Sequence, residues 1–137
     1  MSPLLCNRPD PSAGVALPMV LLRHTLPDGD EHLDWLIARE AALGPLASLR
    51  LSRWPLLEGD TVEVDIARDH DRTWLERQGD VSQGRGTACR IDQGMLQRCL
   101  ETAQGLHMEM CWAELGTQSL LLSEFAEGFE LSVLPSR

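Results

Sequence analysis

The stretch Thr61-Val-Glu-Val-Asp-Ile66 decides the fold class, because its polar and apolar residues alternate without a break. Successive side chains of a β-strand point to opposite faces, so Val62, Val64 and Ile66 share one face. The stretch Leu106-His-Met-Glu-Met-Cys-Trp112 alternates in the same way. This period of two residues predicts strands that bury one face and leave the other in water.

Short apolar runs recur along the chain, separated by turns rich in Gly, Pro and Asp. Such spacing is typical of a β-sandwich or a β-barrel. The segments Asp34–Leu46 and Met95–Thr102 also favour helix, but propensity is a weak guide, and we expect strand in both. We therefore predict an all-β fold, a compact and mostly antiparallel β-barrel with short helices or none. The expected strands are Ala16–His24, His32–Arg39, Leu46–Trp54, Thr61–Ala67, Trp74–Arg77, Gly86–Asp92, Met95–Glu101, Leu106–Glu114, Gln118–Ser123 and Phe129–Leu134.

The length of 137 residues and the hydrophobic content of 43% fit one domain with its own core. Prolines at positions 3, 9 and 11 mark residues 1–14 as an irregular N-terminal arm, and residues 15–137 are expected to form the domain. The net charge is −9 and all 12 basic residues are arginine. This composition excludes coating of nucleic acid by bulk charge, and it excludes Schiff-base chemistry, which needs lysine.

Four cysteines, Cys6, Cys89, Cys99 and Cys111, occur without any C-x-x-C pair, so neither a zinc ribbon nor a thioredoxin motif is expected. We expect reduced thiols and a cytoplasmic protein. The longest apolar stretch, Val15–Leu22, is too short to cross a membrane, and no signal peptide is evident.

A first candidate site lies at the beginning of the domain. If His32–Arg39 is a strand, His32 and Asp34 project from the same face, and a hairpin with the preceding strand brings His24 beside them. Two imidazoles and a carboxylate on a rigid sheet suit a divalent transition metal with positions open for substrate. The alternative is that these residues are merely solvated near a turn.

Two further clusters follow along the chain. Asp69-His-Asp-Arg72 places His70 between carboxylates, as for an oriented acid–base or a phosphate contact, although a polar turn would look the same. The stretch Gln78-Gly-Asp-Val-Ser-Gln-Gly-Arg-Gly-Thr87 lacks the lysine of a P-loop. It could cradle a phosphate with backbone N–H groups and Arg85, or it could form a bulged hairpin.

Taken in order, these clusters resemble the 3′-phosphoesterase domain of bacterial DNA ligase D and its stand-alone relatives. That family has an apolar strand ending in His, a His-aromatic-Asp strand, a D-H-x-x-x-aromatic stretch and a Gly-rich turn followed by Asp-x-Gly. The Gly-rich piece and its position after Asp69-His70 are the most specific part. The matching pieces lie between Val20 and Gly94 and are Val20-Leu-Leu-Arg-His24, His32-Leu-Asp-Trp35, Leu49-Arg-Leu-Ser-Arg-Trp54, Asp69-His-Asp-Arg-Thr-Trp-Leu-Glu76 and Gly79-Asp-Val-Ser-Gln-Gly-Arg-Gly-Thr-Ala-Cys-Arg-Ile-Asp-Gln-Gly94.

The resemblance implies a phosphoesterase-like barrel over residues 15–137 that binds manganese and trims 3′-phosphate or 3′-ribonucleotide ends in DNA repair. The metal ligands then fall on His24, His32 and Asp34, and His70 falls at the scissile phosphate. Trp74 stands where the family usually has Tyr, and Leu36 stands where ligase D often has Arg.

The residue types suggest which groups replace the missing cationic contacts and which partners the protein meets. Arg85, and beside it Arg50 or Arg53, are the candidate phosphate-binding cations, since an arginine fork suits phosphate geometry. The expected partners are a nucleic-acid 3′ end held by weak local contacts and a separate ligase or repair polymerase, with no membrane. Two alternatives remain open: a non-catalytic barrel that binds or scaffolds, and a phosphoesterase for a small substrate other than nucleic acid.

Overall fold

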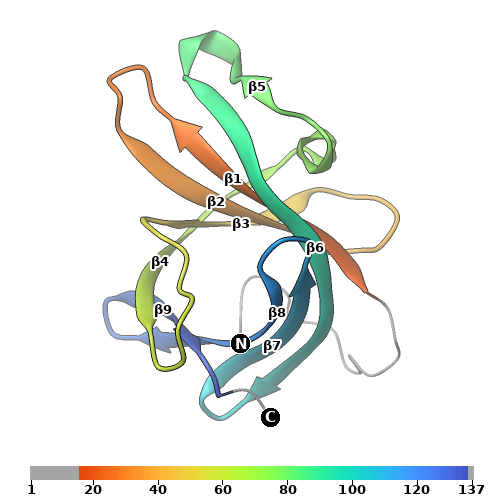
Figure 1. Cartoon of the computed structure of the whole chain (residues 1–137), viewed down its shortest axis with the longest axis vertical. Coiled ribbons are helices and arrows are strands. Elements are labelled where there is room, and N and C mark those ends of the chain that lie inside the picture. The colour runs from red at the N-terminus through yellow and green to blue at the C-terminus, as the bar shows by residue number, and fades with distance from the viewer. Residues whose placement is uncertain (1–15, 136–137) are drawn as a thin grey trace.

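The computed structural model describes residues 16–135, and within them the chain is almost entirely antiparallel sheet (Figure 1). The predicted all-β fold class is confirmed. The expected arm, residues 1–14, lies outside the described residues. The strands are β1 (Leu17–Thr25), β2 (Glu31–Ala38), β3 (Leu46–Leu51), β4 (Thr61–His70), β5 (Gly79–Asp80), β6 (Thr87–Thr102), β7 (Gly105–Trp112), β8 (Gly116–Phe125) and β9 (Gly128–Val133), and two short 3-10 helices are η2 (Arg72–Leu75) and η3 (Ser82–Gly84).

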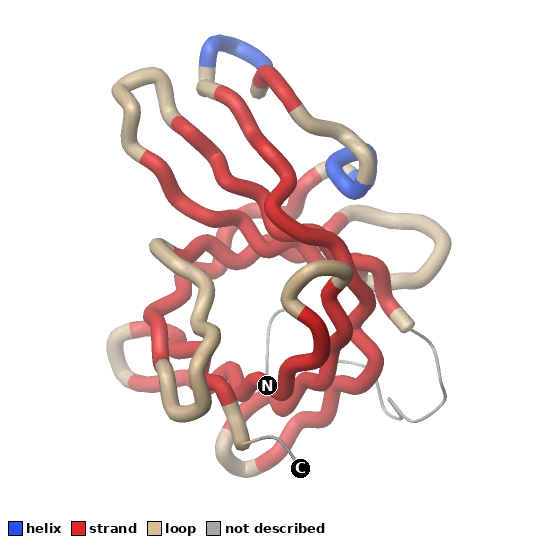
Figure 2. The backbone as a smooth tube through the Cα atoms, in the orientation of Figure 1, coloured by secondary structure: helices blue, strands red, loops and turns tan. Residues whose placement is uncertain are grey.

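Eight of these strands close into a barrel, which Figure 2 shows as a ring of sheet. The order around the ring is β1-β2-β3-β4-β9-β8-β7-β6, and β6 pairs back with β1. The short β5 pairs only with the start of β6 and lies outside the ring. The β1–β2 hairpin and the first part of β6 continue beyond the ring, where they form a platform for the residues that follow β4 (Figure 1).

Alternating side chains fill the inside of the barrel, as the sequence pattern predicts. Val62 and Val64 of β4 are buried there, and so are all four apolar residues of the alternating stretch in β7. Trp54 makes edge-to-face contacts with both Trp35 and Trp112. The Gln118 side-chain oxygen accepts from the indole N–H groups of Trp54 and Trp112 at 2.9 and 3.1 Å, so these buried polar groups are satisfied.

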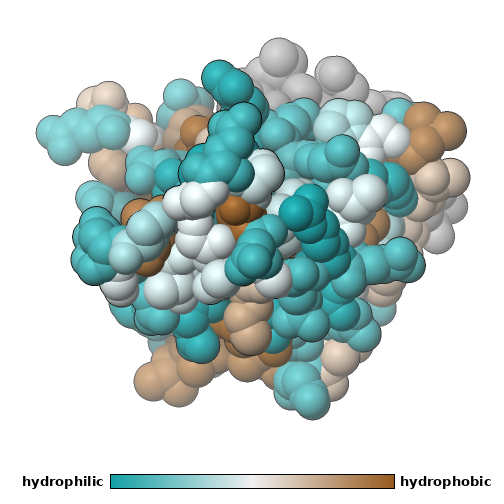
Figure 3. Space-filling view, turned by 90° about the horizontal axis from the view of Figure 1, so that it is seen from above, coloured by the Kyte–Doolittle hydropathy of each residue, from teal (hydrophilic) through white to brown (hydrophobic). Residues whose placement is uncertain are grey.

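A second, smaller apolar cluster lies on the outer face of the barrel. It forms where the segment between β4 and β6 folds back over the β1–β2 hairpin. Figure 3 views the molecule from this end, and the face is mainly hydrophilic around a few apolar patches. The cluster fixes the segment against the sheet, and its members are Val20, Leu22, Leu36, Ala38, Leu46 and Ala88, with Trp74, Leu75 and Val81 packed on them.

The structure corrects three of the expected strands. The strand expected at Trp74–Arg77 is wrong, because Arg72–Leu75 form a 3-10 helix that begins where the Asp71 side chain accepts from the Thr73 N–H. The strands expected at Gly86–Asp92 and Met95–Glu101 are one continuous strand, β6. Gly94 is not a turn residue: a Cβ there would collide with the carbonyl oxygen of Cys111 on β7.

The helix-prone segments, Asp34–Leu46 and Met95–Thr102, contain no helix, as expected. No helix within residues 16–135 is long and apolar enough to cross a membrane.

Candidate functional site

The β1–β2 hairpin brings the first three candidate residues together. His24 of β1 lies directly opposite His32 of β2 in the antiparallel register. Asp34 follows His32 by two residues and therefore projects from the same face. Leu33 and Trp35 point into the barrel core, so His32 and Asp34 are turned to its outer face. The hairpin pairing that the sequence predicts is present.

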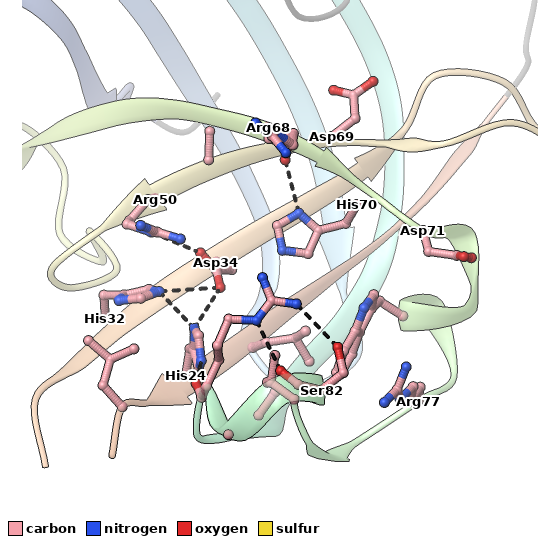
Figure 4. Close-up of a pocket in the computed structure, with 18 of the residues that line it drawn as sticks. His24, His32, Asp34, Arg50, Arg68, Asp69, His70, Asp71, Arg77 and Ser82 are labelled. Carbon is pink, nitrogen blue, oxygen red and sulfur yellow. Dashed lines mark hydrogen bonds and ion pairs between the residues drawn. The ribbon is translucent and has the colours of Figure 1, made fainter. Parts of the chain in front are cut away.

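The ligating atoms of this triad, His24, His32 and Asp34, converge on one point (Figure 4). His24 Nδ1 is 3.1 Å from His32 Nε2, and the Asp34 Oδ2 atom is 3.7 and 3.4 Å from these two nitrogens. Metal–ligand bonds of about 2.0–2.2 Å place neighbouring ligand atoms roughly 3.0–3.5 Å apart. The spacing of the triad thus fits one divalent cation, and its nitrogen and oxygen donors suit a transition metal.

Neighbouring groups orient two members of the triad. The second ring nitrogen of His24, Nε2, lies 2.7 Å from the carbonyl oxygen of Arg85. A carbonyl oxygen can only accept, so Nε2 carries the proton and Nδ1 presents its lone pair to the triad. The other carboxylate oxygen of Asp34, Oδ1, is 3.4 Å from Arg50 Nε. Such outer contacts typically hold metal ligands in the orientation needed for binding.

The environment of His32 favours the neutral form of its imidazole. Burial lowers the pKa of His32 from its ordinary value of 6.5, and the positive charge of Arg50 and the neighbouring His24 act in the same direction. The carboxylate of Asp34 opposes this shift but does not reverse it. A neutral imidazole is the form that binds a metal, so this shift favours a ligand role.

The triad forms one wall of a cavity of about 700 Å³ on the outer face of the barrel. The opposite walls come from the end of β4 and from the segment that carries η2 and η3. Four arginines and three aspartates line the cavity, which leaves one net positive charge against −9 for the whole chain. The cavity is therefore less acidic than the chain as a whole, and its arginines are Arg50, Arg68, Arg77 and Arg85.

His70 lies across the cavity from the triad. Its Nδ1 is 3.1 Å from the carbonyl oxygen of Arg68, so the N–H points to that carbonyl and Nε2 is left for the cavity. Figure 4 shows this side of the ring turned toward Asp34. The carboxylates that flank His70 in sequence do not orient it. Asp69 binds Arg39 through two contacts of 3.0 and 3.1 Å, and Asp71 caps η2.

The capping role of Asp71 also shows in its ionisation. The hydrogen bond from the Thr73 backbone N–H is the main cause of a lowered pKa at Asp71. Its carboxylate is committed to the start of η2, and it is not a proton partner for His70.

The Gly-rich stretch forms a tight turn around η3 that places Arg85 on the cavity. The Arg85 guanidinium is held by the carbonyl and hydroxyl oxygens of Ser82 at 3.0 and 3.2 Å. Gln83 has a left-handed backbone with φ of 64°. This turn-like conformation agrees with the alternative of a turn, and it places Arg85 on the cavity wall.

Some candidates lie elsewhere. Arg53 does not line the cavity, because its guanidinium makes two bonds of 2.7 and 2.8 Å to Asp60. The acidic residues that follow β1, Asp28, Asp30 and Glu31, do not line the cavity, and the Asp28 carboxylate accepts from the Asp30 N–H. Trp74 lines the cavity with the Arg77 guanidinium 4.4 Å above its ring.

The sequence reasoning missed Arg68 and Arg77 as cavity residues. Arg68 lies near the end of β4, two residues before His70, and this i, i+2 spacing was the available signal. Arg77 follows η2, whose strand prediction was wrong, so its place could not be inferred. A scan against models of known families finds no match for this chain, and neither does a search of curated proteins. The geometry of the cavity is therefore the basis for assigning a function.

Proposed function

We propose that this protein is a metal-dependent phosphoesterase that acts on the 3′ ends of DNA or RNA strands. The observation that carries the proposal is the shared cavity, in which the triad faces His70 and four arginines. The resemblance of the motifs to the phosphoesterase domain of DNA ligase D supports the same reaction and suggests a role in repair.

The triad residues are the proposed metal ligands, with manganese as the metal. His24 and His32 each offer one nitrogen and Asp34 one oxygen, which leaves further coordination positions to substrate and water. When bound, the metal supplies a Lewis acid for a phosphate oxygen and lowers the pKa of water. The buried Asp34 carboxylate, 4% exposed, gains a positive partner in addition to Arg50.

The arginines and His70 carry the rest of the proposed chemistry. Arginine forks bind phosphate oxygens in the cavity and balance the charge that grows in the transition state. Hydrolysis adds water oxygen to phosphorus and breaks the bond to the 3′ oxygen of the strand. The attacking water loses one proton to solvent, and the leaving oxygen takes one from a doubly protonated His70. In that form Nδ1–H stays on the Arg68 carbonyl and Nε2–H faces the cavity.

The net charge and the free thiols support proposals about the partners and the cellular location of the protein. With a net charge of −9, the protein would hold only the strand end, and we propose that a separate ligase or repair polymerase presents it. We also propose a cytoplasmic location, which the free thiols of Cys89 and Cys111 support.

A second candidate is a phosphoesterase for a small molecule. The same acidic surface favours it, because a small phosphate ester meets the cavity without bringing a polyanion near the other faces. The non-catalytic alternative is supported by Trp74, which offers no hydroxyl to a substrate where the family usually has Tyr.

Phosphate release separates these alternatives. We would incubate the protein and manganese with a 3′-phosphorylated primer and, separately, with p-nitrophenyl phosphate. We expect release from the primer, and a fall of about 10²- to 10⁴-fold in His70→Ala, because that variant lacks the proton donor. His107→Ala is the matched control, since His107 lies on β7 away from this cavity. Release from the small ester alone favours the second candidate.

Equal rates in wild type and His70→Ala would refute the catalytic role of His70. No release from either substrate by a manganese-loaded protein would leave the non-catalytic barrel as the better description.

Metal binding is tested by titration calorimetry with manganese. Asp34→Asn should weaken binding at least tenfold, because an amide oxygen replaces a charged ligand in the triad. Asp65→Asn is the control: Asp65 lies opposite Arg50 on β4 but does not line the cavity. Equal affinities in these two variants would contradict the metal site.

A further inference from the structure

We propose that the main chain of Arg85 is a positioning element for the metal ligand His24, so that the Gly-rich turn sets the metal affinity of the site. The effect on metal affinity rests on the proposed metal function. The contact between His24 and the Arg85 carbonyl is present without a metal. One residue, Arg85, thereby serves both halves of the site: its carbonyl holds His24, and its side chain lines the cavity.

The hydrogen-bond geometry leaves His24 a single tautomer. Its Nε2 is 2.7 Å from the Arg85 carbonyl oxygen, which has no proton to offer. A lone pair on Nε2 would face that oxygen and repel it, so Nε2 must donate. Nδ1 is then the only ring nitrogen free to accept, and it is the atom 3.1 Å from His32 Nε2.

The position of the Arg85 carbonyl depends on contacts at both ends of the turn. On one side, Ser82 holds the Arg85 side chain. On the other, Gly86 has φ of 96° and passes so close to β1 that a Cβ would collide with the carbonyl oxygen of Thr25, the residue after His24. From Thr87 onward, β6 pairs with Thr25 and His24 in register. Glycine at position 86 thus lets the turn lie against the strand that carries the ligand.

This arrangement ties the anion contact to the metal ligand. A movement of the turn that shifts Arg85 also shifts the carbonyl that orients His24. Outer-shell contacts of this kind typically change metal affinity by 10- to 100-fold. An anion that binds Arg85 and a metal that binds His24 both act on the conformation of the same turn. Because such coupling is reciprocal, each ligand should change the affinity for the other.

The first test reads the tautomer directly in the metal-free protein. Nitrogen-15 NMR of the histidine rings near pH 8 should show His24 as the Nε2–H form, with a proton that exchanges slowly in wild type. His107 serves as the internal reference, since it lies on β7 and does not line this cavity. Observation of His24 as the Nδ1–H form would overturn the inference, whether or not the protein binds metal.

The second test displaces the turn. In Gly86→Ala the added methyl group pushes the turn away from Thr25, and we expect fast exchange at His24 Nε2 and roughly 10- to 100-fold weaker manganese binding. Gly59→Ala is the matched control, because Gly59 has a similar φ of 85° but nothing within 4 Å of its Cβ position. It introduces the same backbone strain at a distance from the cavity.

The outcomes separate the two proposals. A wild type that shows the Nε2–H tautomer but binds no manganese would refute the metal function and leave the positioning contact standing. A wild type that binds manganese, with unchanged affinity and unchanged His24 exchange in Gly86→Ala, would refute the positioning role. If Gly86→Ala does not fold, Ser82→Ala replaces it, with the same signs expected and a smaller effect. Unchanged affinity and exchange in Ser82→Ala would then refute the role.

Discussion

Asp34 shows how a single residue of the site is stabilised. It is buried on the outer face of the barrel, where an ionised carboxylate needs partners to offset its lost hydration. Arg50 meets one oxygen and the two imidazoles meet the other. The spacing of two residues predicted that Asp34 and His32 share a face. The contact with Arg50 could not be predicted in this way, because it depends on the register between β2 and β3.

The lowered pKa of His32 predicts an acid-sensitive fold. Below its ordinary pKa of 6.5, His32 binds a proton more readily in the unfolded chain than in the folded protein. Since the unfolded state then holds more protons, the unfolding free energy should fall as the pH drops below that value. Urea denaturation of the metal-free protein at pH 7.5 and about 5.5 measures this.

The variants His32→Gln and His107→Gln make that measurement specific to the cavity. His32→Gln should lose part of the pH dependence, because the titrating group is gone, whereas His107→Gln removes an imidazole elsewhere and serves as the control. An identical pH dependence in wild type and His32→Gln would show that other groups govern acid stability.

At the scale of elements, the long strand β6 depends on one buried carboxylate. Asp92 is 3% exposed and accepts from the backbone N–H groups of Gln93, Glu114 and Leu115. The bonds from Glu114 and Leu115 tie the middle of β6 to the turn between β7 and β8, beside the irregularity in the β1–β6 register. The sequence motif Asp-x-Gly in this strand therefore has a structural cause.

We predict that Asp92→Ala lowers the unfolding free energy by about 2–4 kcal/mol, because it removes a buried acceptor that holds three backbone N–H groups. Urea denaturation followed by fluorescence measures the change. Glu114→Ala is the matched control: it keeps the backbone N–H that Asp92 binds and removes only an exposed side chain, so its effect should stay within about 0.5 kcal/mol. Similar losses in both variants would refute the anchoring role.

The segment between β4 and β6 is the element that sequence reasoning described least well. Trp74 and Leu75 were predicted to lie in a strand, yet they belong to a short helix and pack with Val81 on the outside of the barrel. Local pattern could not reveal this, because the partner cluster is built from β1, β2, β3 and β6. The order of the motifs could be seen in the sequence. That they form the cavity wall opposite the triad could not be predicted from it.

At the scale of the whole molecule, the net charge and the charge of the cavity have opposite signs. The chain carries −9, and the cavity lining carries one net positive charge. A nucleic-acid strand should therefore be attracted only at the cavity and repelled by the rest of the surface.

We predict a shallow salt dependence for strand binding. If the cavity neutralises about one or two phosphates of a single strand, the logarithm of the affinity should fall with a slope of about −0.7 to −1.4 against the logarithm of salt concentration. Fluorescence anisotropy with short and long 3′-phosphorylated oligonucleotides measures the slope. Affinity should not increase with strand length, and a steep slope that grows with length would contradict end recognition.

The sequence by itself determined the strand class, the alternation of core residues and the shared face of His32 and Asp34, because each depends on the two-residue period of a single strand. The hairpin with His24 followed from chain proximity. Only the tertiary structure decided that His70, Arg68, Arg77 and Arg85 face this triad, since closure of the barrel and packing on its outer face bring distant segments together. It also showed that an arginine carbonyl, which no residue pattern encodes, orients His24.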